Sequence, residues 1–234
     1  RLAPAAKAAG AELWYWNTSD PRSMSWNWLH GIVDDSDVEA AARSVLGDAR
    51  PNDSQPFFYE RDYRWLRSLI KIVGEVYRDK ARPRELIQLV GEQGRLRDLF
   101  RKHPAIQPMA AELTDMLQFP ADKHSEAVSG LLNSLHLFNS SDVVRFSEHS
   151  DFRLPAIGMK PTLLVVGASL ADGRKAEVLS SLMLSRLFSY IYRRFRHGQP
   201  TTVPIYFILD EAARLKERIK FEEVLSISRS ARVG

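Results

Sequence analysis

The sequence has no cysteine among its 234 residues, which excludes a disulfide framework and a thiolate metal site and fits a cytosolic environment. No apolar run approaches the roughly 18 residues that a membrane span needs. The six histidines form no H-E-x-x-H pair, and no G-x-S-x-G elbow is found, so neither a zinc site nor a hydrolase elbow is indicated. With 44% apolar residues, the chain is long enough for one sizeable core or two modest ones.

A Walker A motif, G-x-x-x-x-G-K-[ST], is also missing. The nearest stretch, G-A-S-L-A-D-G-R-K at Gly167–Lys175, has its glycines one residue too far apart, and Arg174 separates the second glycine from Lys175. We interpret this stretch as a strand-to-helix loop and not as a phosphate cradle. Arg1 is not an initiator and the chain ends without a helix cap, so we expect an excerpt of a longer protein.

The net charge of +4 is a mild basic bias that permits an anionic partner without requiring one. The charge is uneven, because residues 61–102 carry 12 basic and six acidic residues. Arg64, Arg67 and Lys71, the basic stripe, belong to a series near helical spacing beside an apolar face. The stripe is either a solvated helix face or a surface that contacts the phosphates of DNA or another cargo.

The most informative stretch that is present is V-P-I-Y-F-I-L-D-E, Val203–Glu211. Its five apolar residues, Ile205–Leu209, are typical of a parallel strand buried on both sides. Asp210 and Glu211 follow where such a strand ends, which is where open α/β sheets bind ligands. In P-loop NTPases an aspartate here holds Mg²⁺, and the adjacent glutamate suits polarising an attacking water. The alternative is a core strand followed by two solvated acids.

The pattern of apolar residues predicts α/β elements on either side of an all-α insert. Strands are predicted at residues 11–16 and 161–167, and a strong helix at 176–196. Between them, helices dominate, beginning with a capping box at Ser36 and Glu39 and a stop at Gly47, with one possible strand at 143–146. Trp26 and Trp28 are either a base-stacking platform or packing residues. The predicted domains are residues 1–35, 36–148 and 149–234.

The order of these features resembles that of type IV secretion coupling proteins, the TraG/TraD-like ATPases of conjugation, over nearly the whole chain. The stretches that carry the resemblance are residues 10–29, 56–66, 150–166, 204–215 and 226–234. Residues 204–215, P-I-Y-F-I-L-D-E-A-A-R-L, followed by S-I-S-R-S-A-R-V-G, are the most specific. In the first stretch, Trp28 stands where the family has proline in an Asn-Pro-Leu-like turn.

The resemblance implies a partial RecA-like P-loop NTPase domain, a parallel sheet with flanking helices, that carries an inserted all-α domain. By position it makes Asp210 the Mg²⁺-associated acid, Glu211 the catalytic carboxylate and Arg229 a finger on a neighbouring subunit's nucleotide. It implies ATP and Mg²⁺ as cofactors of the parent protein, whose Walker A and transmembrane helices would lie upstream. We expect no cofactor on this chain alone.

The function implied is that of a homo-hexameric ring at the cytoplasmic face of the bacterial inner membrane. It would drive DNA, expected to be single-stranded, with a relaxase or effector cargo into a type IV secretion channel. Two alternatives remain open: a helical substrate-recruitment module without catalysis of its own, and a related hexameric DNA translocase not tied to secretion.

Overall fold

The computed structural model describes residues 2–47, 56–167, 173–199, 202–210, 212–215, 218, 219 and 221. By its internal contacts the chain divides into two compact units. Unit 1 comprises Arg1–Trp26 and His149–Gly234, and unit 2 comprises Asn27–Glu148. The contacts thus group residues 27–35 with the helical unit, whereas the domain limits derived from the sequence stay a prediction. Within the described residues, no helix is long and apolar enough to cross a membrane.

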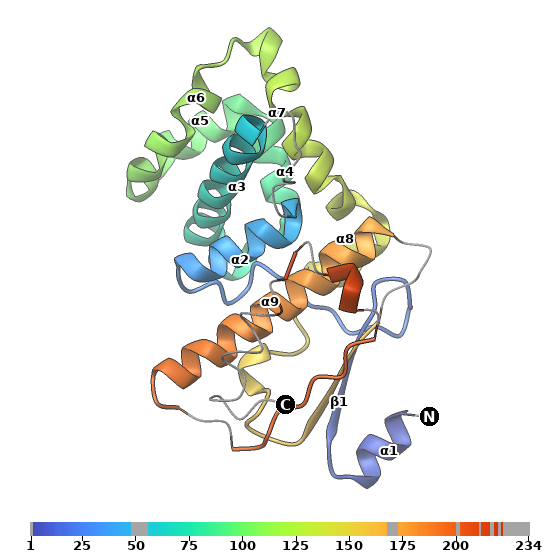
Figure 1. Ribbon diagram of the computed structural model, residues 1–234. Coiled ribbons are helices and arrows are strands. Elements are labelled where there is room, and N and C mark those ends of the chain that lie inside the picture. The colour runs from blue at the N-terminus through green and yellow to red at the C-terminus, as the bar shows by residue number, and fades with distance from the viewer. Residues whose placement is uncertain are drawn as a thin grey trace. The chain divides into compact units, whose positions relative to one another are not determined.

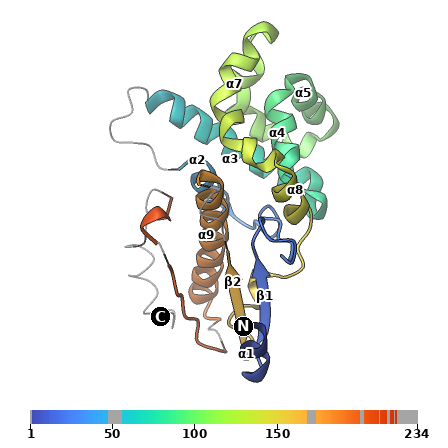
Figure 2. The same cartoon turned by 90° about the vertical axis from the view of Figure 1, so that its right-hand side faces the viewer.

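Unit 1 is built on two parallel strands, β1 (Glu12–Trp16) and β2 (Thr162–Val166), as the sequence predicts. Their register pairs Glu12 with Thr162 and Trp16 with Val166. The short helix α1 (Leu2–Ala8) precedes β1, and the long helix α9 (Arg174–Arg196) follows β2 and runs beside the sheet (Figure 2). β2 ends at Val166 and α9 begins at Arg174. Residues 168–172 lie outside the described residues, so the interpretation of this stretch as a strand-to-helix loop stays a prediction.

Unit 2 is helical in its described part (Figure 1). Its core lies around the central helix α3, where Trp65, Leu66, Leu69, Ile70 and Val73 are fully buried, because apolar residues recur at helical spacing. The α-helices are α2 (Asp35–Leu46), α3 (Pro56–Tyr77), α4 (Pro83–Gly91), α5 (Gln93–Lys102), α6 (Thr114–Gln118), α7 (Ala121–Leu135) and α8 (Ser141–Ser147). The 3₁₀ helices Arg78–Lys80, Pro104–Leu113 and His136–Asn139 connect several of them.

Two local predictions for this unit are wrong. The N-cap expected at Ser36, in a capping box with Glu39, is instead Asp34, so α2 starts two residues earlier. The Asp34 carboxylate accepts a hydrogen bond from Asp37 N. Gly47 ends α2 with φ at 85°, as predicted. The possible strand at residues 143–146 is part of α8. Val143, Phe146 and Ser147 are its buried residues, so burial at helical spacing outweighs the β-propensity of this V-V-R-F stretch.

The predicted strand Ile205–Leu209 is also not formed. The segment is extended and irregular. Ile205 is buried, and the Phe207 ring packs at a tilt against that of Phe188, with 4.9 Å between ring centroids. Tyr206 and Ile208 alternate with them and are 76% and 96% exposed. A strand buried on both sides needs a layer against each face, and in the described part of the chain only the α9 side is covered.

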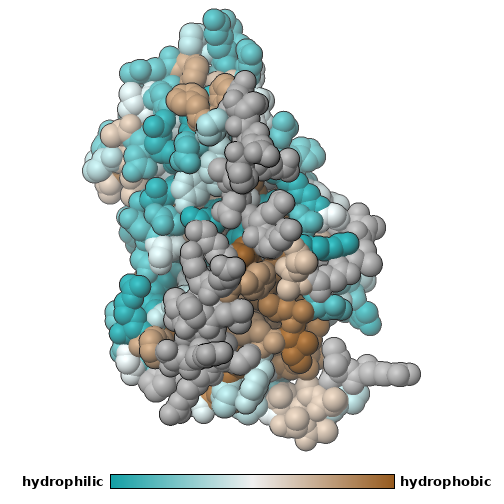
Figure 3. Space-filling view, in the orientation of Figure 1, coloured by the Kyte–Doolittle hydropathy of each residue, from teal (hydrophilic) through white to brown (hydrophobic). Residues whose placement is uncertain are grey.

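Apolar side chains remain exposed in both units. In the space-filling view, a patch of brown surface gathers on the face that unit 1 turns to the viewer (Figure 3). Among the described residues of this unit, the large exposed apolar side chains are those of Met159, Phe195, Tyr206, Ile208 and Leu209. Trp26 and Trp28, by contrast, are 4% and 1% exposed, so the packing interpretation of these two residues is confirmed.

Candidate functional site at the carboxyl end of the sheet

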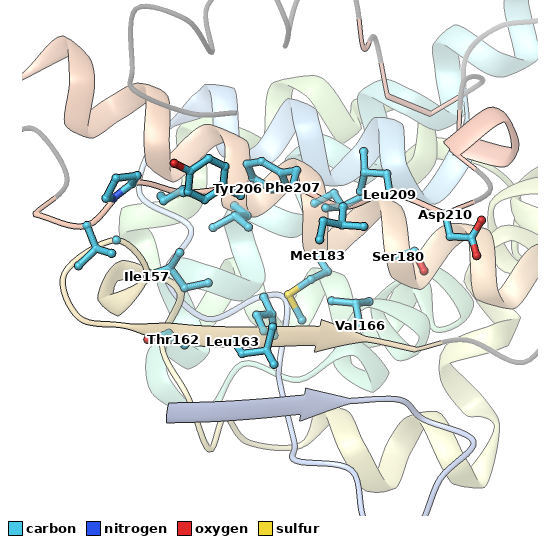
Figure 4. Close-up of a pocket in the computed structure, with 18 of the residues that line it drawn as sticks. Ile157, Thr162, Leu163, Val166, Ser180, Met183, Tyr206, Phe207, Leu209 and Asp210 are labelled. Carbon is cyan, nitrogen blue, oxygen red and sulfur yellow. The ribbon is translucent and has the colours of Figure 1, made fainter. Parts of the chain in front are cut away.

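A cavity of about 510 Å³ in unit 1 is bounded by β2, α9 and residues 203–210 (Figure 4). Its walls are mainly apolar, with Leu164 from β2, Met183 and Leu187 from α9, and Phe207 from the extended segment. Ser180 and Asp210 lie toward the end of the cavity at which β2 finishes with Val166 (Figure 4). The acid predicted to follow the strand therefore lies at the carboxyl end of the sheet, although the strand itself is not formed.

Asp210 supplies the oxygen chemistry that Mg²⁺ requires. Its side chain is exposed and Ser180 lines the same cavity, so both side chains offer oxygen atoms as metal ligands. No group of three or more His, Cys, Asp or Glu residues suited to a metal occurs in the portion of the chain that the structure describes. Mg²⁺ is commonly held by one or two carboxylates together with waters and substrate phosphates. A single acid at this position therefore fits Mg²⁺ that arrives with a nucleotide.

Both predicted catalytic residues, Glu211 and Arg229, lie outside the described residues. Their assignments as catalytic carboxylate and finger remain predictions. Asp210 precedes Glu211 directly in the chain, so the acidic pair starts at the carboxyl end of the sheet.

The loop after β1 lies at the same edge, since β1 and β2 are parallel. Asp20 accepts hydrogen bonds from Arg22 Nε at 3.0 Å, from Arg22 Nη2 at 2.6 Å and from the Tyr15 hydroxyl at 2.9 Å. The Arg22 guanidinium and its backbone N–H hold the pKa of the Asp20 carboxyl well below its usual range. Sequence reasoning treated this loop only as the end of a strand. The D-P-R sequence, in which Asp20 and Arg22 are two residues apart, was the signal from which this ion pair could have been predicted.

The basic stripe lies on α3, and each of its members faces a carboxylate. Arg64 Nη2 lies 2.5 Å from Asp115 Oδ2, and Arg67 Nη2 lies 3.1 Å from Glu39 Oε1. Lys71 Nζ lies 2.9 Å from Asp35 Oδ1. These pairs reduce the field that a phosphate would meet. They favour the solvated-face alternative and link α3 to α2 and to α6.

Arg61, one turn before the stripe, is held differently. Its guanidinium lies 4.9 Å from the Phe58 ring centroid and 4.5 Å from that of Trp65, and it donates to Asp62 Oδ1 and to the Ala127 carbonyl. Asp62 is buried, and this burial raises the pKa of its carboxyl despite the neighbouring guanidinium. A Cβ on Gly130 would lie 2.8 Å from Asp62 Oδ2, so glycine lets α7 approach α3 here.

The fold and the site together define a class. A parallel strand, a following helix and an acid at the sheet's carboxyl end, interrupted by an all-α unit, constitute a partial RecA-like α/β NTPase domain with a helical insert. Solved structures share this fold. The plasmid coupling protein TrwB in complex with the non-hydrolysable ATP analogue ADPNP matches 99% of this chain with a TM-score of 0.68 and 17% identity.

Two further structures are similar: the conjugative coupling protein TrwBdeltaN70 with sulphate, at a TM-score of 0.66 and 17% identity, and TrwB with ADP and Mg²⁺, at 0.63 and 15%. Each match covers 99% of this chain, which spans 57% of the length of those proteins. No curated protein sequence matches the chain. The family model of type IV secretory system conjugative DNA transfer proteins matches residues 3–233, and the chain belongs to this family.

Proposed function

We propose that this chain is part of an ATP-driven coupling protein that recruits DNA with a relaxase or effector cargo and drives it into a type IV secretion channel. The observation that supports this most directly is the position of Asp210 at the carboxyl end of the sheet, in a chain of the conjugative DNA transfer family. TrwB is known in complex with an ATP analogue and with ADP and Mg²⁺, which supports the same cofactors for the parent of this chain.

In this proposal Asp210 would hold Mg²⁺, which would supply charge neutralisation for the transferred phosphoryl group when bound. Glu211 accepts the proton of the attacking water, so its carboxylate must be ionised before the reaction. Arg229 reaches the nucleotide of a neighbouring subunit in a homo-hexameric ring, and the Walker A motif is supplied by residues outside this chain. The ring would lie at the cytoplasmic face of the bacterial inner membrane, anchored by transmembrane helices of the parent.

The experiment that tests the proposal is the Glu211→Gln substitution in the intact parent protein. ATP hydrolysis should fall about 10²- to 10⁴-fold, because a positioned base is lost, while ATP binding stays within several-fold. Glu177→Gln on α9 is the matched control and should hydrolyse ATP like the parent. A Glu211→Gln protein that hydrolyses ATP at the parent rate would remove the catalytic assignment.

A second candidate function is substrate recruitment by the helical unit without catalysis of its own. Its support is that residues 27–148 form a compact helical unit of their own, unit 2. If cargo or DNA binding by the full chain is lost with changes on unit 2 and unaffected by Asp210→Asn, recruitment maps to this unit. A related DNA translocase outside secretion differs from both in its cargo, so relaxase binding by the parent distinguishes it.

A further inference from the structure

The last turn of α9 carries a dense basic sequence, R-R-F-R-H, at residues 193–197. No aspartate or glutamate occurs between Val178 and Leu209, a stretch that contains four arginines. The positive charge at this end of the helix is therefore not compensated by acids nearby in the sequence.

The end of α9 lies at the amino end of the sheet, because α9 runs back beside the strands (Figure 2). Arg194 Nη1 donates to Met159 Sδ, just before β2, and to the Tyr190 hydroxyl at 2.9 Å. The Tyr190 hydroxyl in turn donates to the Pro155 carbonyl at 2.6 Å. The loop that leads into β2 is thereby fixed to the last two turns of α9, and both belong to unit 1.

Exposed side chains from these two segments combine apolar and basic groups. They are Met159, Lys160, Phe195, Arg196 and His197, here called the basic apolar face. Met159 is 45% and Phe195 46% exposed. Lys160 contacts Glu12, an acid at the amino end of β1, and both side chains of this pair remain open to solvent. The basic apolar face thus presents two large apolar side chains among cationic ones.

The helix dipole explains only part of this arrangement. Cations at a helix C-terminus are favourable, and Arg194 Nε donates to the Gln199 carbonyl at 3.0 Å beyond the end of α9. The dipole gives no reason for Phe195 and Met159 to be exposed beside the cations. Apolar side chains that project among basic ones are typical of surfaces that bind anionic lipids, where the cations meet phosphates and the apolar groups enter the headgroup–acyl boundary. A nucleic acid would use the charges, but methionine offers no ring on which a base can stack.

We propose that the basic apolar face binds an anionic phospholipid surface. Lys160 and Arg196 contact headgroup phosphates, while Phe195 and Met159 enter the boundary between the headgroups and the acyl chains. A face of this size gives reversible binding, far weaker than insertion of a transmembrane helix. The proposal goes beyond the transmembrane anchor proposed for the parent, because the lipid contact lies in this chain itself. It does not depend on ATP hydrolysis and is tested without nucleotide.

Sedimentation with vesicles tests the binding. The chain should bind vesicles of phosphatidylglycerol and phosphatidylcholine in equal parts, and pure phosphatidylcholine vesicles at least about tenfold more weakly. The double variant Lys160→Gln, Arg196→Gln should weaken binding to the anionic vesicles about thirtyfold, since each Lys or Arg near an anionic surface contributes about fivefold. Phe195→Ser with Met159→Ser should also weaken it, by about tenfold, but should leave its salt dependence unchanged because no charge is removed.

The matched control carries the same change of charge in unit 2. Lys102→Gln with Lys123→Gln alters two exposed lysines and should bind the anionic vesicles like the unmodified chain. No binding to the anionic vesicles, or an equal loss in the control and in the Lys160→Gln, Arg196→Gln variant, would overturn the proposal.

The chain's lack of cysteine allows a second measurement with one engineered thiol. An environment-sensitive dye on His197→Cys should shift its emission to shorter wavelength with the anionic vesicles, because the label enters the headgroup region. The same dye on Ser125→Cys, an exposed position of α7, should show no shift. Absence of a shift at residue 197 would overturn the proposal. If the chain instead bound a single-stranded oligonucleotide and lost that binding in the Lys160→Gln, Arg196→Gln variant, the face would be assigned to nucleic acid.

Discussion

Asn17 and Gly167 lie against each other where β1 and β2 end, so closely that a Cβ on Gly167 would be 2.8 Å from Asn17 Nδ2. Asn17 has little freedom to retreat. Its Nδ2 donates to the Tyr15 hydroxyl at 3.1 Å and its Oδ1 accepts from Ser19 N at 3.0 Å. The ladder continues through Gly167 N, which donates to the Trp16 carbonyl at 2.8 Å. Because Gly167 has no side chain, the residues that follow β1 and β2 can approach each other this closely.

The first prediction follows from this contact. Gly167→Ala should lower the stability of the chain by about 1–3 kcal/mol, the usual cost of overpacking a tight site. Gly74→Ala in α3 is the control, because nothing lies within 4 Å of its added Cβ, and it should raise stability by about 0.5–1 kcal/mol through helix propensity. Thermal unfolding of the two variants measures both effects. Equal melting temperatures for Gly167→Ala and the parent would contradict the close contact.

The second prediction concerns the basic stripe. Replacing Arg64, Arg67 and Lys71 with Glu should weaken binding of DNA and flatten its salt dependence if the stripe contacts phosphates, because fewer counterions are released. The structure supplies the complementary variant. Neutralising Asp115, Glu39 and Asp35 as Asn, Gln and Asn removes the three carboxylate partners and should strengthen binding and steepen the salt slope.

Titrations of both triple variants with a fluorescent oligonucleotide at several salt concentrations distinguish a phosphate-contacting surface from a solvated helix face. If neither variant changes the affinity or the slope, the stripe is a solvated face that links helices. Thermal unfolding should be monitored in parallel, because each exposed pair contributes about 0.2–1 kcal/mol to stability and the reversed variant also brings like charges together.

The sequence was sufficient to predict the elements whose apolar faces are covered by other described parts of the same chain. The strand at residues 11–16 and the helix ending at Arg196 follow from apolar periodicity, and their partners are present to bury them. The stretch Ile205–Leu209 has an equally strong pattern, but no strand is formed. Its pattern encodes burial on two sides, and in the described residues only one side is covered, as the exposure of Ile208 shows.

Asp210 lies at the carboxyl end of the sheet, as the sequence predicts, although the strand Ile205–Leu209 on which the prediction was based is not formed. The contacts between distant residues were not predictable. Nothing in the sequence pairs Arg67 with Glu39, or Ser25 with Asp151, because these partners are brought together by the packing of whole helices and loops. The helix start at Asp34 was missed for a smaller reason. Three candidate cap residues, Asp34, Asp35 and Ser36, are consecutive, and composition alone does not choose among them.

The third prediction uses the buried carboxyl of Asp62, whose pKa is raised by burial from an ordinary value of 3.8. Between the ordinary pKa and the raised folded-state pKa, the folded protein binds more protons than the unfolded one. Stability should therefore fall as the pH rises through this window and level off above the folded-state pKa. Asp62→Asn abolishes the titration, so its melting temperature relative to the parent should rise over the same window.

Melting temperatures of parent and variant, measured at half-unit steps from pH 3.5 upward, test this sign. Asp122→Asn at an exposed position of α7 controls for the loss of a general negative charge. A difference between parent and Asp62→Asn that is flat with pH would mean that the carboxyl is not destabilised by its burial between α3 and α7.

The fourth prediction concerns Arg229 in the intact parent. If its guanidinium reaches a neighbour's γ-phosphate, Arg229→Ala should cut turnover by about 10³- to 10⁵-fold, as for arginine fingers supplied in trans in other NTPases. Mixing Arg229→Ala with Glu211→Gln subunits should restore part of the activity, because some interfaces then combine an intact finger with an intact carboxylate. No recovery in mixtures that are shown to contain mixed rings would argue against a role in trans.

The last prediction concerns ATP binding by the 234-residue chain itself. A phosphate cradle needs backbone N–H groups at a helix N-terminus and a lysine near the β- and γ-phosphates. The sequence has no Walker A motif, and the Gly167–Lys175 loop departs from it in both glycine spacing and lysine position. Asp210 adds negative charge at the sheet edge and Glu211 follows it directly in the sequence, so a triphosphate without a cradle should be repelled there. Calorimetric titration of the isolated chain with Mg²⁺-ATP should therefore show no binding at micromolar concentrations.

A micromolar dissociation constant would mean that the chain forms a nucleotide site of its own. Repeating the titration with Lys175→Ala would then show whether the Gly167–Lys175 loop supplies it, because loss of binding in this variant would place the phosphates at that loop.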